Sequence, residues 1–219
     1  MAVSLLLPQR CALCTRPGEA LCGHCRAALV RLAPPLCERC GAPGAWPVRR
    51  CAECAGRRLA FATARAALVY DDRARVLVGT WKERGRRDLD RVAGTLVAEV
   101  LPRPGVDGLA AVPSDPERGI ARGHAPAAGL ARELASRWEL PLLSPLARLG
   151  AARRQRGLGL ASRRRNVAGA FVARGPVPRR VCLVDDVYTT GSTVHACAAA
   201  LRRVGAARVE VVSLARAVR

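Results

Sequence analysis

Apolar and polar positions alternate along residues 59–219 in a pattern that predicts strands separated by helices. Short runs rich in Val, Leu and Ala predict strands at 62–70, 108–113, 179–184 and 209–215, whereas longer runs with apolar residues every three or four positions predict helices at 88–101, 125–138 and 192–205. This alternation is typical of an α/β fold with a parallel sheet flanked by helices. Ligands bind beyond the carboxyl ends of the strands in such sheets, so we expect a site at that edge.

Residues 1–58 have a different pattern, which is dominated by cysteine. Two thiolates in a Cys-x-x-Cys turn can bind one metal ion, and two such pairs complete a tetrahedral site. Four pairs therefore predict two structural zinc ions in a ribbon-like module at 1–58, followed by a second domain at 59–219. Neighbouring pairs could share an ion, or the pairs could interleave. The eight cysteines are Cys11, Cys14, Cys22, Cys25, Cys37, Cys40, Cys51 and Cys54.

A disulfide framework is the main alternative to zinc, and it requires an oxidising compartment. The N-terminal segment has no basic residue before its short apolar stretch, so it makes a poor signal peptide. No apolar run approaches the ~18 residues of a membrane span. We therefore expect a cytoplasmic protein with reduced cysteines. Within the module, residues 26–33 predict a short helix that ends at Pro34, and His24 is expected to be a bystander. Cys182 and Cys197 are expected to be buried thiols.

The net charge of +20 favours partners rich in phosphate, either nucleic acid or a small ligand. Only Lys82 of the 37 basic residues is lysine, so biased composition explains part of the excess. A lone lysine among arginines indicates either a site that needs a compact ammonium group or a solvated helix end. Aromatic residues make up 3% of the chain, which is a poor supply of stacking surfaces for single-stranded DNA.

A cluster of acidic, hydroxyl and glycine residues follows the predicted strand at 179–184 and precedes the helix at 192–205. Asp185 and Asp186 can accept hydrogen bonds from vicinal hydroxyls or from magnesium-bound water. The hydroxyl-rich loop, residues 189–193, can direct backbone N–H groups toward an anion at the start of a helix. The pattern predicts a sugar-phosphate site rather than a capped turn. The loop consists of Thr189, Thr190, Gly191, Ser192 and Thr193.

Residues 181–193 resemble the 5-phosphoribosyl-1-pyrophosphate (PRPP) signature of type I phosphoribosyltransferases. Nearly the whole chain resembles the ComF family, a group of phosphoribosyltransferase-like proteins associated with DNA uptake that carry an N-terminal cysteine-rich zinc module. The resemblance rests on the four Cys-x-x-Cys pairs, this signature, and the segments 77–85, 110–125 and 153–171. It implies a type I phosphoribosyltransferase-like sheet.

The same resemblance implies roles for residues in three other segments. Pyrophosphate would be bound by Lys82, Pro113, Ser114, Arg118 and Arg122. A flexible lid would contain Gln155, Arg163 and Asn166; a solvated loop or a nucleic-acid contact is the alternative for this arginine-rich stretch. The family usually has an aromatic residue, Asn and Gln after the Arg122-Gly123 pair. This chain has His124, Ala125 and Pro126 there, and its three histidines have no obvious partners.

The resemblance implies transfer of a phosphoribosyl group with magnesium pyrophosphate as the leaving group, and it gives Asp185 and Asp186 the catalytic role. The transition state would resemble an oxocarbenium ion, so no covalent nucleophile is needed. The alternative is a non-catalytic module that senses PRPP or a nucleotide and binds single-stranded DNA or a DNA-uptake protein. The acceptor is not indicated by the sequence.

Overall fold

The computed structural model describes residues 9–114, 124–149 and 170–218. A five-stranded sheet with the order β1-β7-β6-β2-β3 forms its centre, and every neighbouring pair in it is parallel. The predicted parallel α/β architecture is therefore confirmed. The strands of this sheet are β1 (Thr63–Val69), β2 (Gly108–Ala111), β3 (Leu142–Leu143), β6 (Arg180–Tyr188) and β7 (Arg208–Arg216). A small antiparallel pair consists of β4 (Leu146–Arg148) and β5 (Phe171–Ala173).

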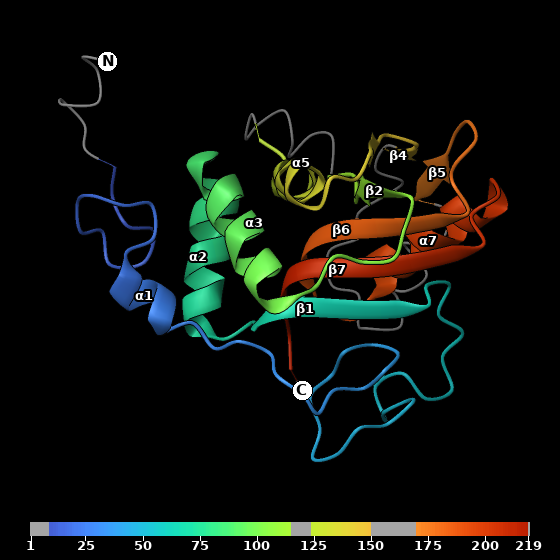
Figure 1. The fold of residues 1–219 in the computed structure, drawn as a ribbon, viewed down its shortest axis with the longest axis horizontal. Helices are drawn as coiled ribbons and strands as arrows, with labels where there is room; N and C mark the ends of the chain where they lie inside the picture. The colour runs from blue at the N-terminus through green and yellow to red at the C-terminus, as the bar shows by residue number, and fades with distance from the viewer. Residues whose placement is uncertain (1–8, 115–123, 150–169, 219) are drawn as a thin grey trace, which may run out of the picture.

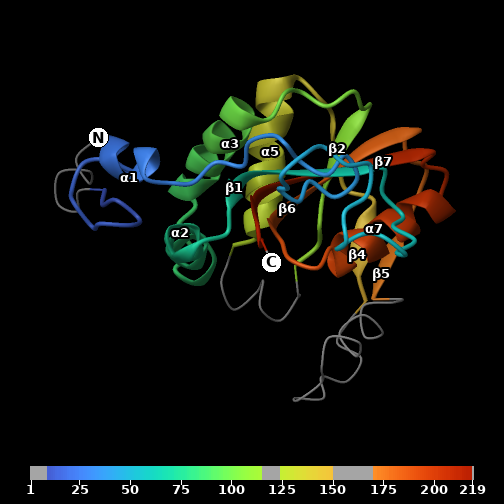
Figure 2. The same cartoon turned by 90° about the horizontal axis from the view of Figure 1, so that it is seen from below.

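Helices cover both faces of the sheet (Figures 1 and 2). On one face, α3 (Asp88–Val100) and α5 (Pro126–Trp138) bury Leu96 and Leu130 in a core shared with α2 (Asp72–Glu83). On the other face, α7 (Ser192–Arg203) buries Leu201 in a second core. The described parts of the chain contain no helix that is long and apolar enough to cross a membrane.

The cysteine-rich segment runs along the free side of β1 and forms two separate ribbons (Figure 1). The first ribbon, residues 11–25, lies beside α2, and the second ribbon, residues 37–54, lies on the far side of β1 from α3. Between them, the chain bonds to the strand: Leu32 N donates to Ala67 O at 2.9 Å. The edge strand is thus covered, which protects its backbone groups from unwanted pairing.

Two local predictions from the sequence were wrong, and one helix was missed. The short helix α1 spans Gly23–Ala27 rather than residues 26–33. Helix α2 was not predicted, although its buried residues Ala74, Leu77, Val78 and Trp81 have helical spacing. Strand β6 continues to Tyr188, so Asp185 and Asp186 lie within the strand rather than after it. The extension occurs because β7 offers backbone partners as far as Arg216, which pairs with Tyr188.

Candidate functional site

A pocket of about 360 Å³ opens at the carboxyl edge of the sheet, where β2 and β6 end next to each other. This edge is where ligands bind in parallel α/β sheets, so the pocket lies where the sequence led us to expect a site. Residues from six separate segments line it. Seven of the residues predicted to form the site line it: Lys82, Pro113, Ser114, Asp185, Asp186, Thr189 and Thr193. The fold therefore brings together segments more than one hundred residues apart in the chain.

The two acidic residues occupy one wall of the pocket and differ in their partners. Asp186 Oδ2 lies 2.7 Å from Lys82 Nζ, and both side chains are mostly buried. Asp185 Oδ1 accepts a hydrogen bond from the backbone N–H of Asp186 at 2.9 Å. Burial is the largest influence on Asp185 and raises its pKa, the charge of Asp186 raises it further, and Lys82 opposes both. The pKa of Asp185 is about 7 as a result.

The hydroxyl-rich loop turns tightly between β6 and α7. Gly191 has a φ of 70° and forms the N-cap of α7, and the backbone N–H of Ser192 donates a 3.3 Å hydrogen bond to Thr190 Oγ1. A Cβ atom at Gly191 would lie 2.3 Å from the hydroxyl oxygen of Tyr188, so only glycine fits there. The hydroxyl groups of Thr190 and Ser192 lie 2.8 Å apart. Thr193 lies in the first turn of this twelve-residue helix and lines the pocket together with Thr189, so the amino end of α7 lies beside the pocket.

Lys82 reaches the pocket from α2, which fixes the ammonium group next to Asp186. The alternative of a solvated helix end is wrong, because the Lys82 side chain is 28% exposed and ion-paired. Pro113 and Ser114 follow β2 and also line the pocket. The other residues predicted for pyrophosphate and for the lid lie outside the described residues; they are Arg118, Arg122, Gln155, Arg163 and Asn166.

His124 also lines the pocket, and the expectation that the histidines lack partners was wrong for it. Its Nε2 atom lies 3.1 Å from Asp90 Oδ1, which also accepts a 2.7 Å hydrogen bond from Trp81 Nε1. The Nε2 atom is buried and has no hydrogen-bond partner among the described residues. No sequence pattern indicated this cluster, because its three members lie on three different segments.

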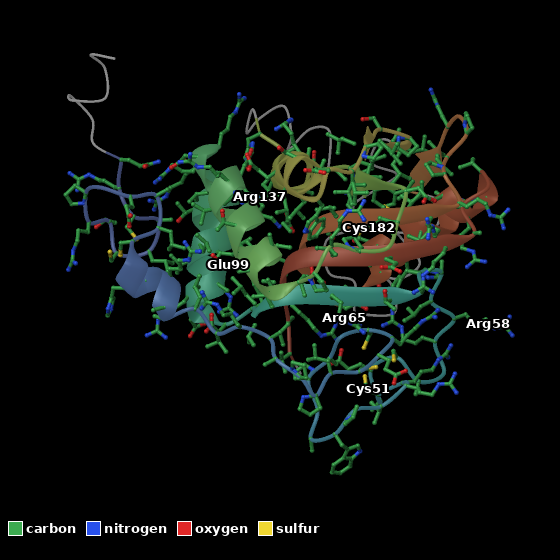
Figure 3. The ribbon with its side chains drawn as sticks, in the orientation of Figure 1. Cys51, Arg58, Arg65, Glu99, Arg137 and Cys182 are labelled. Carbon is green, nitrogen blue, oxygen red and sulfur yellow. The ribbon has the colours of Figure 1, made fainter. Side chains whose placement is uncertain are left out.

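The cysteines form two sets of four, Cys11/Cys14/Cys22/Cys25 and Cys37/Cys40/Cys51/Cys54, and the sulfur atoms in each set lie within 4.8 Å of one another. Neighbouring pairs share a site, so the interleaved arrangement is excluded (Figure 3). An all-sulfur tetrahedral set is the usual donor set for structural zinc.

The surroundings of the sulfur atoms also fit a metal site. Burial, the largest influence on Cys11, raises its pKa, but hydrogen bonds from backbone N–H groups outweigh it and lower the pKa to about 6, which favours the metal-binding thiolate. Burial has the opposite outcome at Cys25 of the same set and raises its pKa to about 12. His24 belongs to neither set. Cys182 and Cys197 are fully buried, as predicted.

The chain is similar to several known proteins. Residues 2–56 match the double zinc ribbon domain. The fold is similar to purine phosphoribosyltransferase from Pyrococcus horikoshii Ot3, with a TM-score of 0.35 and 18% identity over 57% of this chain and 82% of that one. It is also similar to orotate phosphoribosyltransferase from Aeropyrum pernix, with a TM-score of 0.33 and 21% identity over 68% of this chain and 67% of that one.

Two curated relatives match over most of their length. Competence protein F from Haemophilus influenzae is 30% identical over 91% of both chains. The DNA utilization protein YhgH from Salmonella typhi is 31% identical over 97% of this chain and 99% of the relative. Together with the two four-cysteine sites and the parallel sheet, these matches show that the chain belongs to the ComF family.

Proposed function

We propose that the pocket binds PRPP or a closely related sugar phosphate, and that the protein transfers the phosphoribosyl group to an acceptor. The observation that carries this proposal is the meeting of two carboxylates, one ammonium group and the amino end of a helix around a single pocket of about 360 Å³. In this arrangement the hydroxyl-rich loop receives the 5′-phosphate through backbone N–H groups, and the helix dipole favours the negative charge. Asp185 and Asp186, which line the same pocket, would then accept hydrogen bonds from the ribose hydroxyls.

Lys82, Pro113 and Ser114 would bind the pyrophosphate end of the ligand. The Lys82 ammonium group is held next to Asp186, so a cation is already in position for the phosphate oxygens. Carboxylates at a phosphate site suit Mg²⁺, which prefers oxygen ligands. When bound, the ion would neutralise charge on the pyrophosphate. Asp185 and Asp186 are the residues that would hold its water ligands or the ribose diol.

The proposed reaction breaks the bond between ribose C1 and the pyrophosphate oxygen, and the electron pair leaves with pyrophosphate. The acceptor supplies the electron pair for the new bond to C1. The protein provides orientation at both ends of the sugar and positive charge at the departing oxygen, which are the contributions that such a loose transition state needs. Among the described residues, none that lines the pocket is placed as a covalent nucleophile, and the reaction requires none.

Isothermal titration calorimetry with PRPP and MgCl₂ tests this proposal. We expect the wild type to bind with one site per chain, and the Asp185→Asn/Asp186→Asn double variant to bind at least about tenfold more weakly, because it lacks both carboxylates. Asp107→Asn is the matched control, since Asp107 pairs with Arg180 far from the pocket lining. A wild type that releases or absorbs no heat with PRPP would contradict the proposal.

A second candidate function is a non-catalytic one, in which the pocket senses PRPP or a nucleotide while the protein handles single-stranded DNA. The names of the relatives, competence protein and DNA utilization protein, favour this candidate together with the net charge of +20. Incubation with PRPP, magnesium and a panel of nucleobases, amines or DNA separates the two. Pyrophosphate release supports transfer, whereas PRPP binding without release, accompanied by salt-sensitive DNA binding, supports sensing.

A further inference from the structure

The second ribbon shares a hydrophobic core with the hydroxyl-rich loop and α7. Cys40, Phe61, Tyr188 and Val194 are all buried in this core, which brings a zinc ligand close to the residues on both sides of the loop. The first ribbon belongs to the other core, with α2, α3 and α5. The two zinc centres therefore support different parts of the molecule, and only the second one is packed against the loop.

Arg216 connects the second zinc centre to the sheet. Its side chain is 1% exposed, and its Nη1 donates a 2.7 Å hydrogen bond to the carbonyl oxygen of Cys40. Its Nη2 forms a 2.7 Å ion pair with Glu53 and lies 3.7 Å from Cys40 Sγ. A buried arginine of this kind is costly unless its partners are fixed. The partners here are Cys40, one of the four ligands of the second site, and Glu53, an acid that lies in the chain between two further ligands, Cys51 and Cys54.

The same guanidinium group lies over the ring of Tyr188, with its carbon atom 4.6 Å from the ring centre. Tyr188 ends β6 and pairs in register with Arg216 of β7. On its other side, the Tyr188 hydroxyl group occupies the space that a side chain on Gly191 would need. The ring is thus held between the arginine and the turn of the hydroxyl-rich loop.

Two further contacts join the cysteine-rich segment to this turn. Arg57 Nη1 donates a 2.9 Å hydrogen bond to the carbonyl oxygen of Thr190, the residue before Gly191. The backbone N–H of Ala60 donates to His195 Nδ1 at 3.0 Å, in the first turn of α7. Both residues closely follow the last cysteine of the second ribbon, so their positions depend on how that ribbon is folded.

We propose that the second zinc centre positions the hydroxyl-rich loop, with Arg216 as the positioning residue that connects Cys40 and Glu53 to Tyr188. Without zinc the second ribbon loses its fold, Arg216 loses its fixed partners, and the Tyr188 ring no longer supports the turn at Gly191. The identity of the anion at this loop rests on the proposed function. The dependence of the loop's position on the second zinc centre does not. Zinc at the second site is then a requirement for anion binding at a loop that contains no zinc ligand.

Hydrogen–deuterium exchange of the full-length protein tests the connection without any ligand. We expect Arg216→Met to speed exchange of the amides in residues 188–197 by about tenfold, the factor for losing a hydrogen bond to a charged group. Arg65→Met is the matched control, because Arg65 also joins the second ribbon to β1, through the carbonyl oxygens of Glu38 at 2.9 Å and of the zinc ligand Cys37 at 3.5 Å. Figure 3 labels Arg65 on β1, and its hydrogen bonds run to the ribbon and to β1 rather than to Tyr188 or the loop. It should leave exchange in residues 188–197 unchanged.

Two more variants keep the test decisive if Arg216→Met folds poorly. Glu53→Gln removes the acidic partner of Arg216 and should accelerate the same amides. Cys51→Ser should lower the zinc content by one ion per chain and produce the same change. The inference would be overturned if Arg216→Met, Glu53→Gln or Cys51→Ser folded and still exchanged the amides of residues 188–197 at the wild-type rate.

Calorimetry on the same samples then separates this inference from the proposed function. Weaker PRPP binding by Arg216→Met than by Arg65→Met supports both the proposed function and the role of the second zinc centre. A wild type that does not bind PRPP contradicts the proposed function, whereas the exchange result decides the inference.

Discussion

Gly191 is the residue whose replacement tests the shape of the hydroxyl-rich loop most directly. We expect Gly191→Ala to destabilise the protein by roughly 2–4 kcal/mol, because the new methyl group would meet the Tyr188 hydroxyl at 2.3 Å and the φ of 70° disfavours any side chain. PRPP binding should be lost with it. Chemical denaturation and calorimetry measure the two effects.

Gly175 provides the matched control for this substitution. It has a nearly identical φ of 72°, but a Cβ atom there would meet nothing within 4 Å. Gly175→Ala should therefore cost only the backbone strain, about 1 kcal/mol, and leave PRPP binding intact. Equal losses of stability in the two variants would show that the contact with Tyr188 is unimportant.

The raised pKa of Asp185 makes a prediction about stability and pH. The folded protein binds this proton with a pKa of about 7, whereas an unfolded aspartate has a pKa of about 3.9. Between these values the folded state holds more protons, so the wild type loses stability as pH rises through this window. Asp185→Asn lacks this effect and should become more stable than the wild type by on the order of 1–3 kcal/mol between pH 5 and 8. Thermal or urea unfolding at several pH values measures it; a stability difference independent of pH would contradict it.

At the scale of elements, the contact between α3 and α5 depends on a glycine. A Cβ atom at Gly129 of α5 would lie 2.2 Å from Asp90 Oδ2, and Asp90 is held in place by Trp81 Nε1. We expect Gly129→Ala to destabilise the protein by about 1–3 kcal/mol through this overpacking. Urea denaturation measures the change.

Gly79 in α2 is the control for this effect. A Cβ atom there would meet nothing within 4 Å, so Gly79→Ala should stabilise the protein by about 0.5–1 kcal/mol through helix propensity alone. If both substitutions changed stability in the same direction, the close approach of α3 and α5 would not be the cause.

The elements show which parts of the fold the sequence could predict. The strands and helices around 63–69, 88–100, 126–138 and 208–216 were predictable because their apolar pattern is local and periodic. The sequence was sufficient to predict that the eight cysteines bind two zinc ions. It did not determine which Cys-x-x-Cys pairs share an ion, and the structure was needed for that. The boundary between a zinc-binding module at 1–58 and a second domain at 59–219 stays a prediction. Strand β6 was extended by four residues because its length depends on pairing with β7, which no local pattern records.

The candidate site was predictable only in part, for the same reason. The acids and the hydroxyl-rich loop form one continuous motif, so the sequence alone located them. The ion pair between Lys82 and Asp186 and the His124–Asp90 contact join residues far apart in the chain. Lys82 was singled out as the lone lysine and by the resemblance to a family, but neither indicated its partner Asp186. The support that Arg216 gives to Tyr188 has no sequence signal, because it connects the end of β7 to a cysteine ribbon.

At the scale of the whole molecule, zinc should hold together more than the ribbons themselves. Metal analysis of protein purified under reducing, chelator-free conditions should find two zinc ions per chain, since the structure forms two complete four-sulfur sites. Removal of zinc by a strong chelator should lower the melting temperature of the entire chain, because each ribbon contributes buried residues to one of the two cores. Protein without zinc, or a sheet whose melting is unaffected by the chelator, would contradict this prediction.

The order of the strands has a consequence for how the chain acquires its fold during synthesis. Strand β7 lies between β1 and β6, so β1 finds no strand of the sheet to pair with until residues 208–216 emerge from the ribosome. Contacts across so long a separation form slowly, and the unpaired edge of β1 is exposed to other chains in the meantime. The early cysteine ribbons are translated before β1 and bond to its other edge, so nascent chains supplied with zinc should escape aggregation more often than chains starved of it.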